Sequence, residues 1–248
     1  RRVLGRCALR SPSQAQQVVK VVYQAVIPVG LRALTPAYEQ SSGNNLEFTF
    51  GNPQQTIGRL RDGMPADVVI YGNAIASDLA KENRIDAATR AKIASVKLGM
   101  AIPASATKPD MSNGAAITVI LRAARKIAVT DPKGGGTTTF VFDAFEKLGL
   151  TQELTPKLVL IDGTGEDVAE AVAAGKADIG FSAMSELAAI KGVQAIGPLP
   201  PDVSSLLVVI HAVVTAHPAN RAAGQEFTSF LQSPGTNSLF ASFAFVLE

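Results

Sequence analysis

The chain has 248 residues, 47% of them hydrophobic and 18% charged, which suits one large domain or two lobes with substantial apolar cores. The net charge is +2 and no cluster of lysine and arginine is interleaved with aromatic residues, which argues against binding to nucleic acid. No run of about 18 apolar residues occurs, so the sequence predicts no membrane span.

The N-terminal segment, residues 1–17, resembles the remnant of a targeting sequence. Two arginines lead it, and small residues at 13–16 resemble a cleavage region. The single cysteine, Cys7, cannot form an intramolecular disulfide or a multi-thiolate metal site. The stretch Leu4-Gly5-Arg6-Cys7 loosely resembles a lipoprotein box, and the alternative is an unpaired thiol in a tail. We therefore expect an exported protein, periplasmic or extracellular.

Strand-like and helix-like segments alternate along the rest of the chain. Strands are predicted where apolar residues run together or alternate with polar ones, and helices where apolar residues recur every three to four positions. The predicted strands are 18–29 (with its following turn), 46–50, 67–71, 97–103, 126–130, 158–161, 178–182, 193–196 and 206–215. The predicted helices are 31–40, 54–61, 74–82, 115–125, 140–148, 167–174, 185–190, 220–232 and 234–239, with 86–93 a turn or further helix and 131–139 a loop. This alternation predicts an α/β fold with parallel sheets.

Two apolar runs, 97–103 and 206–215, are candidates for crossings between two lobes. If both cross, residues 102–205 form a second lobe that is inserted into the first. The first lobe then consists of residues 18–101 and 206–248, and residues 1–17 form a tail. Two crossings at one edge predict a hinge, with a cleft between the lobes.

Tight turns lead from several predicted strands into helices, where unpaired backbone N–H groups suit a negatively charged ligand. Asn52, Gln54 and Gln55 have side-chain amides that both donate and accept hydrogen bonds. The threonines at 137–139 follow three glycines, an arrangement that can wrap backbone N–H groups around a carboxylate, and Lys133 can add a positive charge. The alternatives are a plain turn at Asn52-Pro53 and a flexible loop that caps a helix at 134–139.

Other polar residues have simpler explanations. Tyr71, at a strand end, either lines the cleft or ends the strand. His211 lies in an apolar run and is expected in the core or at the crossing between lobes, whereas His217 precedes a proline and is expected at the surface. Glu166-Asp167 opens a helix, where acidic residues favour the helix dipole. No H-E-x-x-H, G-x-S-x-G or G-x-G-x-x-G motif occurs, so the sequence indicates no catalytic site.

The segment Phe50-Gly51-Asn52, followed by Gly63-Met64-Pro65-Ala66-Asp67-Val68, resembles the molybdate-type solute-binding proteins, the type II periplasmic receptors of ABC importers. The segments 125–132 and 176–180, and the F-L-x-S-P pattern at 230–234, are similar to further parts of this family. The resemblance covers nearly the whole chain from Val18 onward.

This resemblance implies a two-lobed type II periplasmic-binding-protein fold that closes on a ligand in the interlobe cleft. In the molybdate receptors, serine hydroxyls and backbone N–H groups hold the oxyanion. The corresponding loops of this chain, together with the strand end at Tyr71, provide the predicted ligand-binding residues: Gln24, Ala25, Asn52, Gln54, Gln55, Tyr71, Thr137, Thr138, Thr164, Gly165 and Ser182. Most of the family's serines and its tyrosine are absent here, so the solute is either an oxyanion or a small polar organic acid.

The sequence and the resemblance together predict a monomeric solute-binding protein that has no cofactor or metal and binds a small anionic or polar solute. Delivery of that solute to an ABC permease in the membrane is implied by the resemblance alone. Three alternatives remain open: an enzyme on the same scaffold, the sensing half of a regulator, and a scaffold that has lost its transport role. The sensing alternative would need a helix-turn-helix, for which residues 1–17 are too short.

Overall fold

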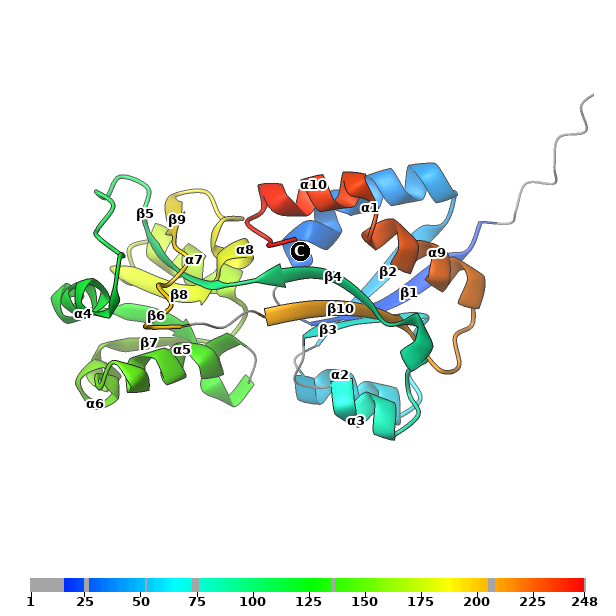
Figure 1. Ribbon diagram of the computed structural model, residues 1–248, viewed down its shortest axis with the longest axis horizontal. Helices are drawn as coiled ribbons and strands as arrows, with labels where there is room; N and C mark the ends of the chain where they lie inside the picture. Colours follow the sequence, from blue (N-terminus) through cyan, green and yellow to red (C-terminus); the bar gives the residue numbers. More distant parts are fainter. Residues whose placement is uncertain are drawn as a thin grey trace, which may run out of the picture.

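The computed structural model describes residues 16–24, 27–51, 53–72, 76–134, 137–204 and 208–247. The chain forms two α/β lobes that lie side by side, each built on a five-stranded sheet with helices on both faces (Figure 1). The predictions made for residues 1–15, including Cys7, lie outside the described residues. No helix among the described residues is both long and apolar enough to cross a membrane.

The first sheet has the strand order β2-β1-β3-β10-β4. β1 pairs in parallel with β2 and β3, while β10 is antiparallel to β3 and β4. The strands are β1 (Val18–Tyr23), β2 (Asn45–Phe50), β3 (Val68–Gly72), β4 (Ala91–Val96) and β10 (Val208–Val214). One face is covered by α1 (Pro28–Ser42), α9 (Arg221–Leu231) and α10 (Pro234–Ser242), and the other by α2 (Pro53–Arg61) and α3 (Ala76–Lys81), with the short helix η2 (Ala87–Thr89) before β4.

The second sheet has the order β7-β6-β8-β5-β9, with β6 parallel to β7 and β8. Its strands are β5 (Leu98–Pro103), β6 (Ile127–Thr130), β7 (Leu158–Ile161), β8 (Ile179–Ala183) and β9 (Val193–Ile196). One face is covered by α4 (Gly114–Ala123), α5 (Thr137–Lys147) and α6 (Thr151–Leu154), and the other by α7 (Gly165–Ala173) and α8 (Met184–Leu187). Two short helices, η3 (Pro132–Gly134) and η4 (Thr155–Lys157), precede α5 and β7.

Local sequence explains where these elements begin and end. α1 ends at Gly43, whose φ of 74° is the left-handed conformation that glycine adopts most easily. α4 begins after Asn113, whose side chain accepts a hydrogen bond from the N–H of Ala116. β3 is apolar throughout because helices cover both of its faces, whereas β2, at the sheet edge, alternates between more and less exposed residues.

The structure differs from the sequence prediction in four elements. Residues 91–96 form strand β4, although a turn or helix was expected over 86–93 and no element over 94–96, because Ala91, Ile93 and Ala94 pack into the first core. Residues 137–139 form the first turn of α5 and not a loop. β5 pairs with β8 and β9, so the chain passes between the sheets at Lys97 and not at residue 101. The short helix α6 was not predicted.

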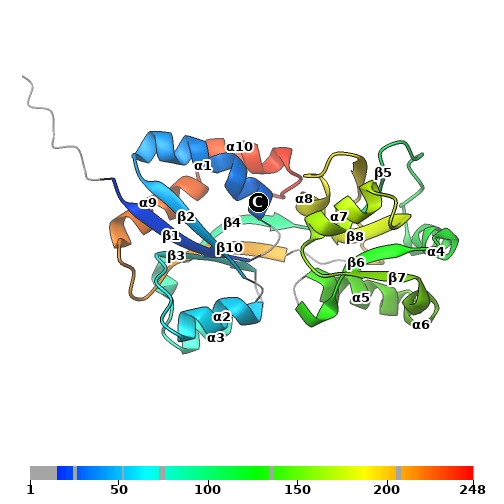
Figure 2. The same cartoon turned by 180° about the vertical axis from the view of Figure 1, so that it is seen from behind.

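The two lobes meet at the ends of their parallel strands. β8 ends beside the crossing point, since the N–H of Met184 donates to the carbonyl of Lys97 at 2.9 Å. β6 and β7 run parallel to β8, while β1, β2 and β3 run in the same direction as β4, which leads into Lys97. All six strands therefore end where the lobes face each other, which we call the interlobe edge (Figure 2).

Gly99 at the start of β5 allows α8 to pack against the crossing. A Cβ atom at this position would lie 2.0 Å from Met184 Sδ and 2.9 Å from the Ile196 carbonyl oxygen. We predict that Gly99→Ala destabilises the protein by about 1–3 kcal/mol, because backbone or side chain must move. Gly58→Ala is the matched control: the site is open within 4 Å and lies inside α2, so this variant should gain about 0.5–1 kcal/mol. Urea unfolding measures both, and a Gly99→Ala variant as stable as the parent would contradict the packing described.

Candidate functional site

The interlobe edge gathers the N-termini of helices from both lobes. α1, α2 and α3 follow β1, β2 and β3, and α5, α7 and α8 follow β6, β7 and β8. In open α/β sheets, the crevice outside the carboxyl ends of the strands is the usual ligand position, and helix N-termini favour anions there.

Four of the predicted site residues, all in the first lobe, contribute little that can be described. Ala25 and Asn52 lie outside the described residues, as does the side chain of Gln54. Gln55 is exposed in the first turn of α2.

Gln24 lies at the end of β1 and is the predicted residue whose surroundings most resemble a binding site. Its side chain is 8% exposed, and its Oε1 atom accepts the N–H of Gly72 at the end of β3. Its Nε2 group is buried and has no hydrogen-bond partner among the described residues. A buried amide donor without a partner costs about 1–3 kcal/mol, so an acceptor that reached Nε2 at the interlobe edge would gain a desolvated hydrogen bond.

Tyr71 lies beneath α2 and α3, where it packs with Val22, Leu60 and Leu79 and is 1% exposed. Its ring stacks on His211 at a centroid distance of 5.8 Å, and burial raises the pKa of its hydroxyl. The structure therefore places this side chain in the core of the first lobe, and not on an open wall.

His211, which the sequence predicted to be a core residue, is 9% exposed in β10, so that prediction is confirmed. Arg90 Nη2 lies 3.0 Å from His211 Nε2. Burial, with the positive charges of Arg90 and Lys92, lowers the pKa of His211 to about 4, so the imidazole is neutral at pH 7.

Thr137 and Thr138 open α5, in the second lobe. Thr137 is half-buried, whereas Thr138 is 1% exposed and its hydroxyl pairs with that of Thr130 at the end of β6. The hydroxyl of Thr138 is thus already used inside the lobe. The backbone N–H groups of the first turn of α5 have no intrahelical partners and can still face an anion.

The other predicted residues of the second lobe surround carboxylates at the N-terminus of α7. The N–H and hydroxyl of Thr164 donate to Asp167 Oδ2, at 2.7 and 2.9 Å. The N–H of Gly165 donates to Glu186 Oε1 at 3.0 Å, and the Ser182 hydroxyl donates to Glu186 Oε2 at 2.8 Å. These donors are therefore saturated by the chain's own acids in this structure.

Glu186 is a residue that the sequence analysis missed. It is 1% exposed, and a Cβ atom on Gly165 would lie 2.5 Å from its Oε2 atom, so the absence of a side chain at 165 makes room for the carboxylate. Burial, together with the charge of Glu166, raises the pKa of Glu186 to about 7, against the lowering effect of the hydrogen bonds from Gly165, Ser182 and Ala183. Nothing in the local sequence separates this glutamate from a surface one.

A second missed feature joins the lobes directly. Arg32 Nη2 on α1 lies 2.6 and 2.9 Å from the two carboxylate oxygens of Glu166 on α7. Tyr23, at the end of β1, is close enough to both charges for them to act on its pKa, which burial raises overall. No sequence signal could have found this pair, because 134 positions separate its members.

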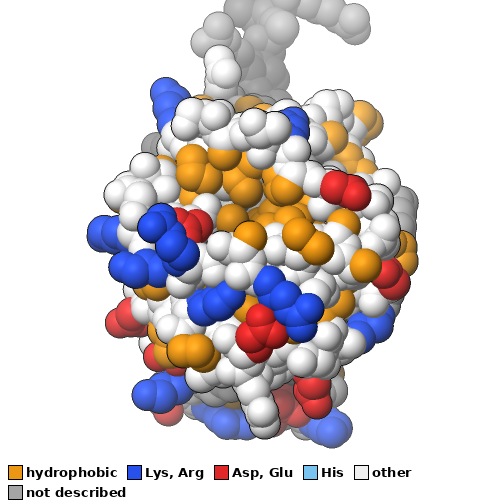
Figure 3. All heavy atoms as spheres, turned by 90° about the vertical axis from the view of Figure 1, so that its left-hand side faces the viewer, with side chains coloured by type: hydrophobic (Ala, Val, Ile, Leu, Met, Phe, Trp, Pro, Cys, Tyr) orange, Lys and Arg blue, Asp and Glu red, His pale blue; other side chains and the backbone are white. Residues whose placement is uncertain are grey.

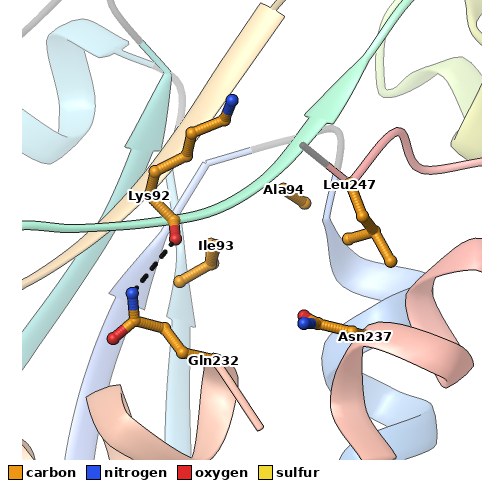
Figure 4. A pocket seen from close by; sticks show the side chains of 6 residues that line it. All are labelled: Lys92, Ile93, Ala94, Gln232, Asn237 and Leu247. Atoms are coloured by element: carbon orange, nitrogen blue, oxygen red, sulfur yellow. Dashed lines mark hydrogen bonds between the residues drawn. The ribbon is translucent and has the colours of Figure 1, made fainter. Parts of the chain in front are cut away.

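Other surfaces of the described structure offer weaker sites. A cavity of about 170 Å³ is lined by Lys92, Ile93, Ala94, Gln232, Asn237 and Leu247, on the side of the first lobe that carries α9 and α10 (Figure 4). At the outer end of the second lobe, acidic and basic side chains are interspersed around an apolar hollow (Figure 3). Among the described residues, no group of three or more His, Cys, Asp or Glu could hold a metal ion.

Comparison with known proteins gives related results at the levels of family, sequence and fold. The sequence pattern of the bacterial extracellular solute-binding protein family matches residues 19–246. Aconitate isomerase from a Pseudomonas species is 29% identical over 207 residues, covering 80% of this chain and 78% of that protein. The molybdate-binding protein ModA of Escherichia coli (strain K12) is 25% identical over 236 residues, covering 93% and 89%.

A solved structure extends the match to the fold. The periplasmic molybdate-binding protein of Azotobacter vinelandii superposes with a TM-score of 0.76 at 20% identity, covering 93% of this chain and 99% of that one. The two-lobed α/β architecture predicted from the sequence is thereby confirmed.

The raised pKa of Glu186 predicts a specific pH dependence of stability. Because the folded chain holds this proton more tightly than the unfolded chain, the resulting stabilisation is full below about pH 4.5 and is lost as the pH rises through about 7. Glu186→Gln removes the titration, so its stability relative to the parent should rise by up to about 3 kcal/mol between pH 5 and pH 8.

Urea unfolding of both proteins in the same buffers measures this difference and cancels the opposing titration of His211, which is common to both. Glu170→Gln, an exposed position on the neighbouring helix α7, is the matched control. A difference between Glu186→Gln and the parent that stays constant from pH 5 to pH 8 would show that Glu186 does not titrate in this range.

Proposed function

We propose that this chain, which belongs to the bacterial extracellular solute-binding protein family, binds a small anion between its lobes and delivers it to an ABC permease in a membrane. The protein would work in the periplasm or outside the cell, as a monomer, and would release the solute unaltered. The family membership supports export and solute binding, while the permease, the oligomeric state and the site are parts of the proposal.

The observation that carries the proposed site is the buried amide of Gln24. Its oxygen is engaged with Gly72, so its orientation is set, and its Nε2 group is left as a desolvated donor at the interlobe edge. A solute oxygen would satisfy that donor. Hydrogen bonds to a charged acceptor contribute about 1.5–3 kcal/mol, more than those to a neutral one, so an anion is favoured.

The chemical class of the solute follows from the donors around it. The first turns of α1 and α5 offer N–H groups from opposite lobes, and both helix dipoles favour negative charge. The relatives named for molybdate and for aconitate share oxygen-rich anions as their named ligands. Both an oxyanion and a carboxylate suit this arrangement, and contact with both lobes would supply the differential affinity that closure requires.

Gln24→Glu tests the site, because glutamate has the same shape and still accepts from Gly72 but replaces the donor by a charge. We predict a loss of anion affinity of tenfold to a hundredfold or more, as expected for a lost charged hydrogen bond plus repulsion. Calorimetric titration with molybdate, sulfate, citrate and trans-aconitate first identifies a solute and then compares the variants. Gln225→Glu, exposed on α9, adds the same charge away from the site and should bind normally. Equal affinity of Gln24→Glu and parent would remove Gln24 from the site.

A second candidate function is favoured by the similarity to aconitate isomerase: turnover of an unsaturated tricarboxylate on the same scaffold. We expect binding without turnover. Incubation of the protein with cis-aconitate, and separately with trans-aconitate, followed by proton NMR of the vinyl signal, measures interconversion directly. Catalysed interconversion in both directions, absent in a heat-denatured control, would replace transport by catalysis as the function.

A further inference from the structure

The ion pair between Arg32 and Glu166 is unusual among those of the described residues because it connects the two lobes. Arg61–Glu82 and Arg221–Asp86 lie within the first lobe, and Arg122–Glu153 and Arg125–Asp178 lie within the second. In contrast, Arg32 belongs to α1 on the first sheet and Glu166 to α7 on the second. Any motion that separates α1 from α7 must break it.

Helix electrostatics favour only one member of this pair. Glu166 lies in the first turn of α7, where the dipole stabilises an acid. Arg32 lies near the beginning of α1, which has no acidic residue in its first turn, so the dipole opposes its charge there. A negatively charged partner therefore stabilises the Arg32 side chain, and that partner, Glu166, belongs to the other lobe.

The surroundings of Glu166 also favour this contact. Its side chain is 18% exposed, against 60% for Arg32. Its chain neighbour Asp167 and the buried Glu186 already accept N–H groups at the N-terminus of α7, and the charge of Glu166 acts on the pKa of Glu186. Without Arg32, a third acid at this helix end would face its neighbours with no counter-charge. Closing the pair relieves that repulsion and brings α1 towards α7.

Apolar contacts of β8 and α8 also join the two lobes. Ala183, at the end of β8, belongs to the core cluster of the first lobe, and Met184 of α8 packs against that cluster. α8 therefore holds the second lobe against the first near the crossing. The ion pair is a separate contact, between α1 and α7. A short connection at Lys97 allows the lobes to reorient around this contact.

We infer that the Arg32–Glu166 pair is an interlobe latch that stabilises the approach of α1 to α7 and so increases the closed fraction of the protein before solute arrives. The consequence for binding rests on the proposed function: apparent affinity scales with the closed, binding-competent fraction. The consequence for the lobe separation does not depend on any solute.

The test measures the separation of the lobes in exhaustively dialysed, solute-free protein. Spin labels at Asp62→Cys and Asp143→Cys, both exposed and on different lobes, are placed in a full-length Cys7→Ser background and read by double electron–electron resonance. Arg32→Ala and Glu166→Ala should each shift or broaden the distance distribution towards longer values. The reversed pair, Arg32→Glu with Glu166→Arg, should restore it, which also excludes misfolding as the cause.

Two controls separate the latch from general charge effects. Removing the exposed pair Arg122–Glu153, within the second lobe, should leave the distribution unchanged. Raising the salt to 1 M should increase the distance between the two labels in the parent protein, because salt screens a partly exposed ion pair. The same salt should leave the distance in Arg32→Ala unchanged. With a solute from the calorimetric panel, both single variants should lose affinity by the same factor, up to about tenfold.

Unchanged distance distributions in both single variants would overturn the latch, even if the protein binds solute as proposed. A large loss of affinity in Arg32→Ala alone, with Glu166→Ala unaffected, would also overturn it and would make Arg32 a direct solute contact. If no solute binds at all, the proposed function fails while the distance measurements still decide on the latch.

Discussion

The direction of the parallel strands is the constraint on which the rest of this structure depends. In both sheets, three parallel strands end at the interlobe edge, and each is followed by a helix that begins there. Backbone N–H groups from two independent cores therefore point into one region, without any charged side chain being needed to place them. The single-residue link at Lys97 keeps the two edges facing each other and still allows rotation.

The two lobes use their helix ends differently. In the second lobe, Asp167 and Glu186 accept the N–H groups of Thr164 and Gly165 at the start of α7, and burying Glu186 is tolerated because Gly165, Ser182 and Ala183 all donate to it. In the first lobe, Gln24 presents a buried donor that the described residues leave unused. This asymmetry favours recognition led by the first lobe, with α5 completing the contact and α7 engaged through Glu166 in holding the lobes together.

Regular features of the sequence predicted most of the fold. The continuous apolar run at 68–71 indicated a strand covered on both faces, and Gly43 marked the end of α1. Strand β4 was not predicted, because Lys92 and Ser95 interrupt its apolar pattern. It forms a strand because it pairs with β10 on one side and with Val246 of the C-terminal segment on the other. The predicted binding residues included Gln24, but neither the burial of Glu186 nor the Arg32–Glu166 contact has a local signature. Both depend on segments that meet only after the two sheets have formed.

The central claim is that one small anion is held by both lobes at the interlobe edge. Amide hydrogen exchange, with and without a solute found by calorimetry, tests it most directly. The account predicts slower exchange on binding at the ends of β1 and β3 and in the first turns of α1 and α5, in both lobes together. Protection confined to one lobe, or to the residues around the cavity between β4, α9 and α10, would contradict it.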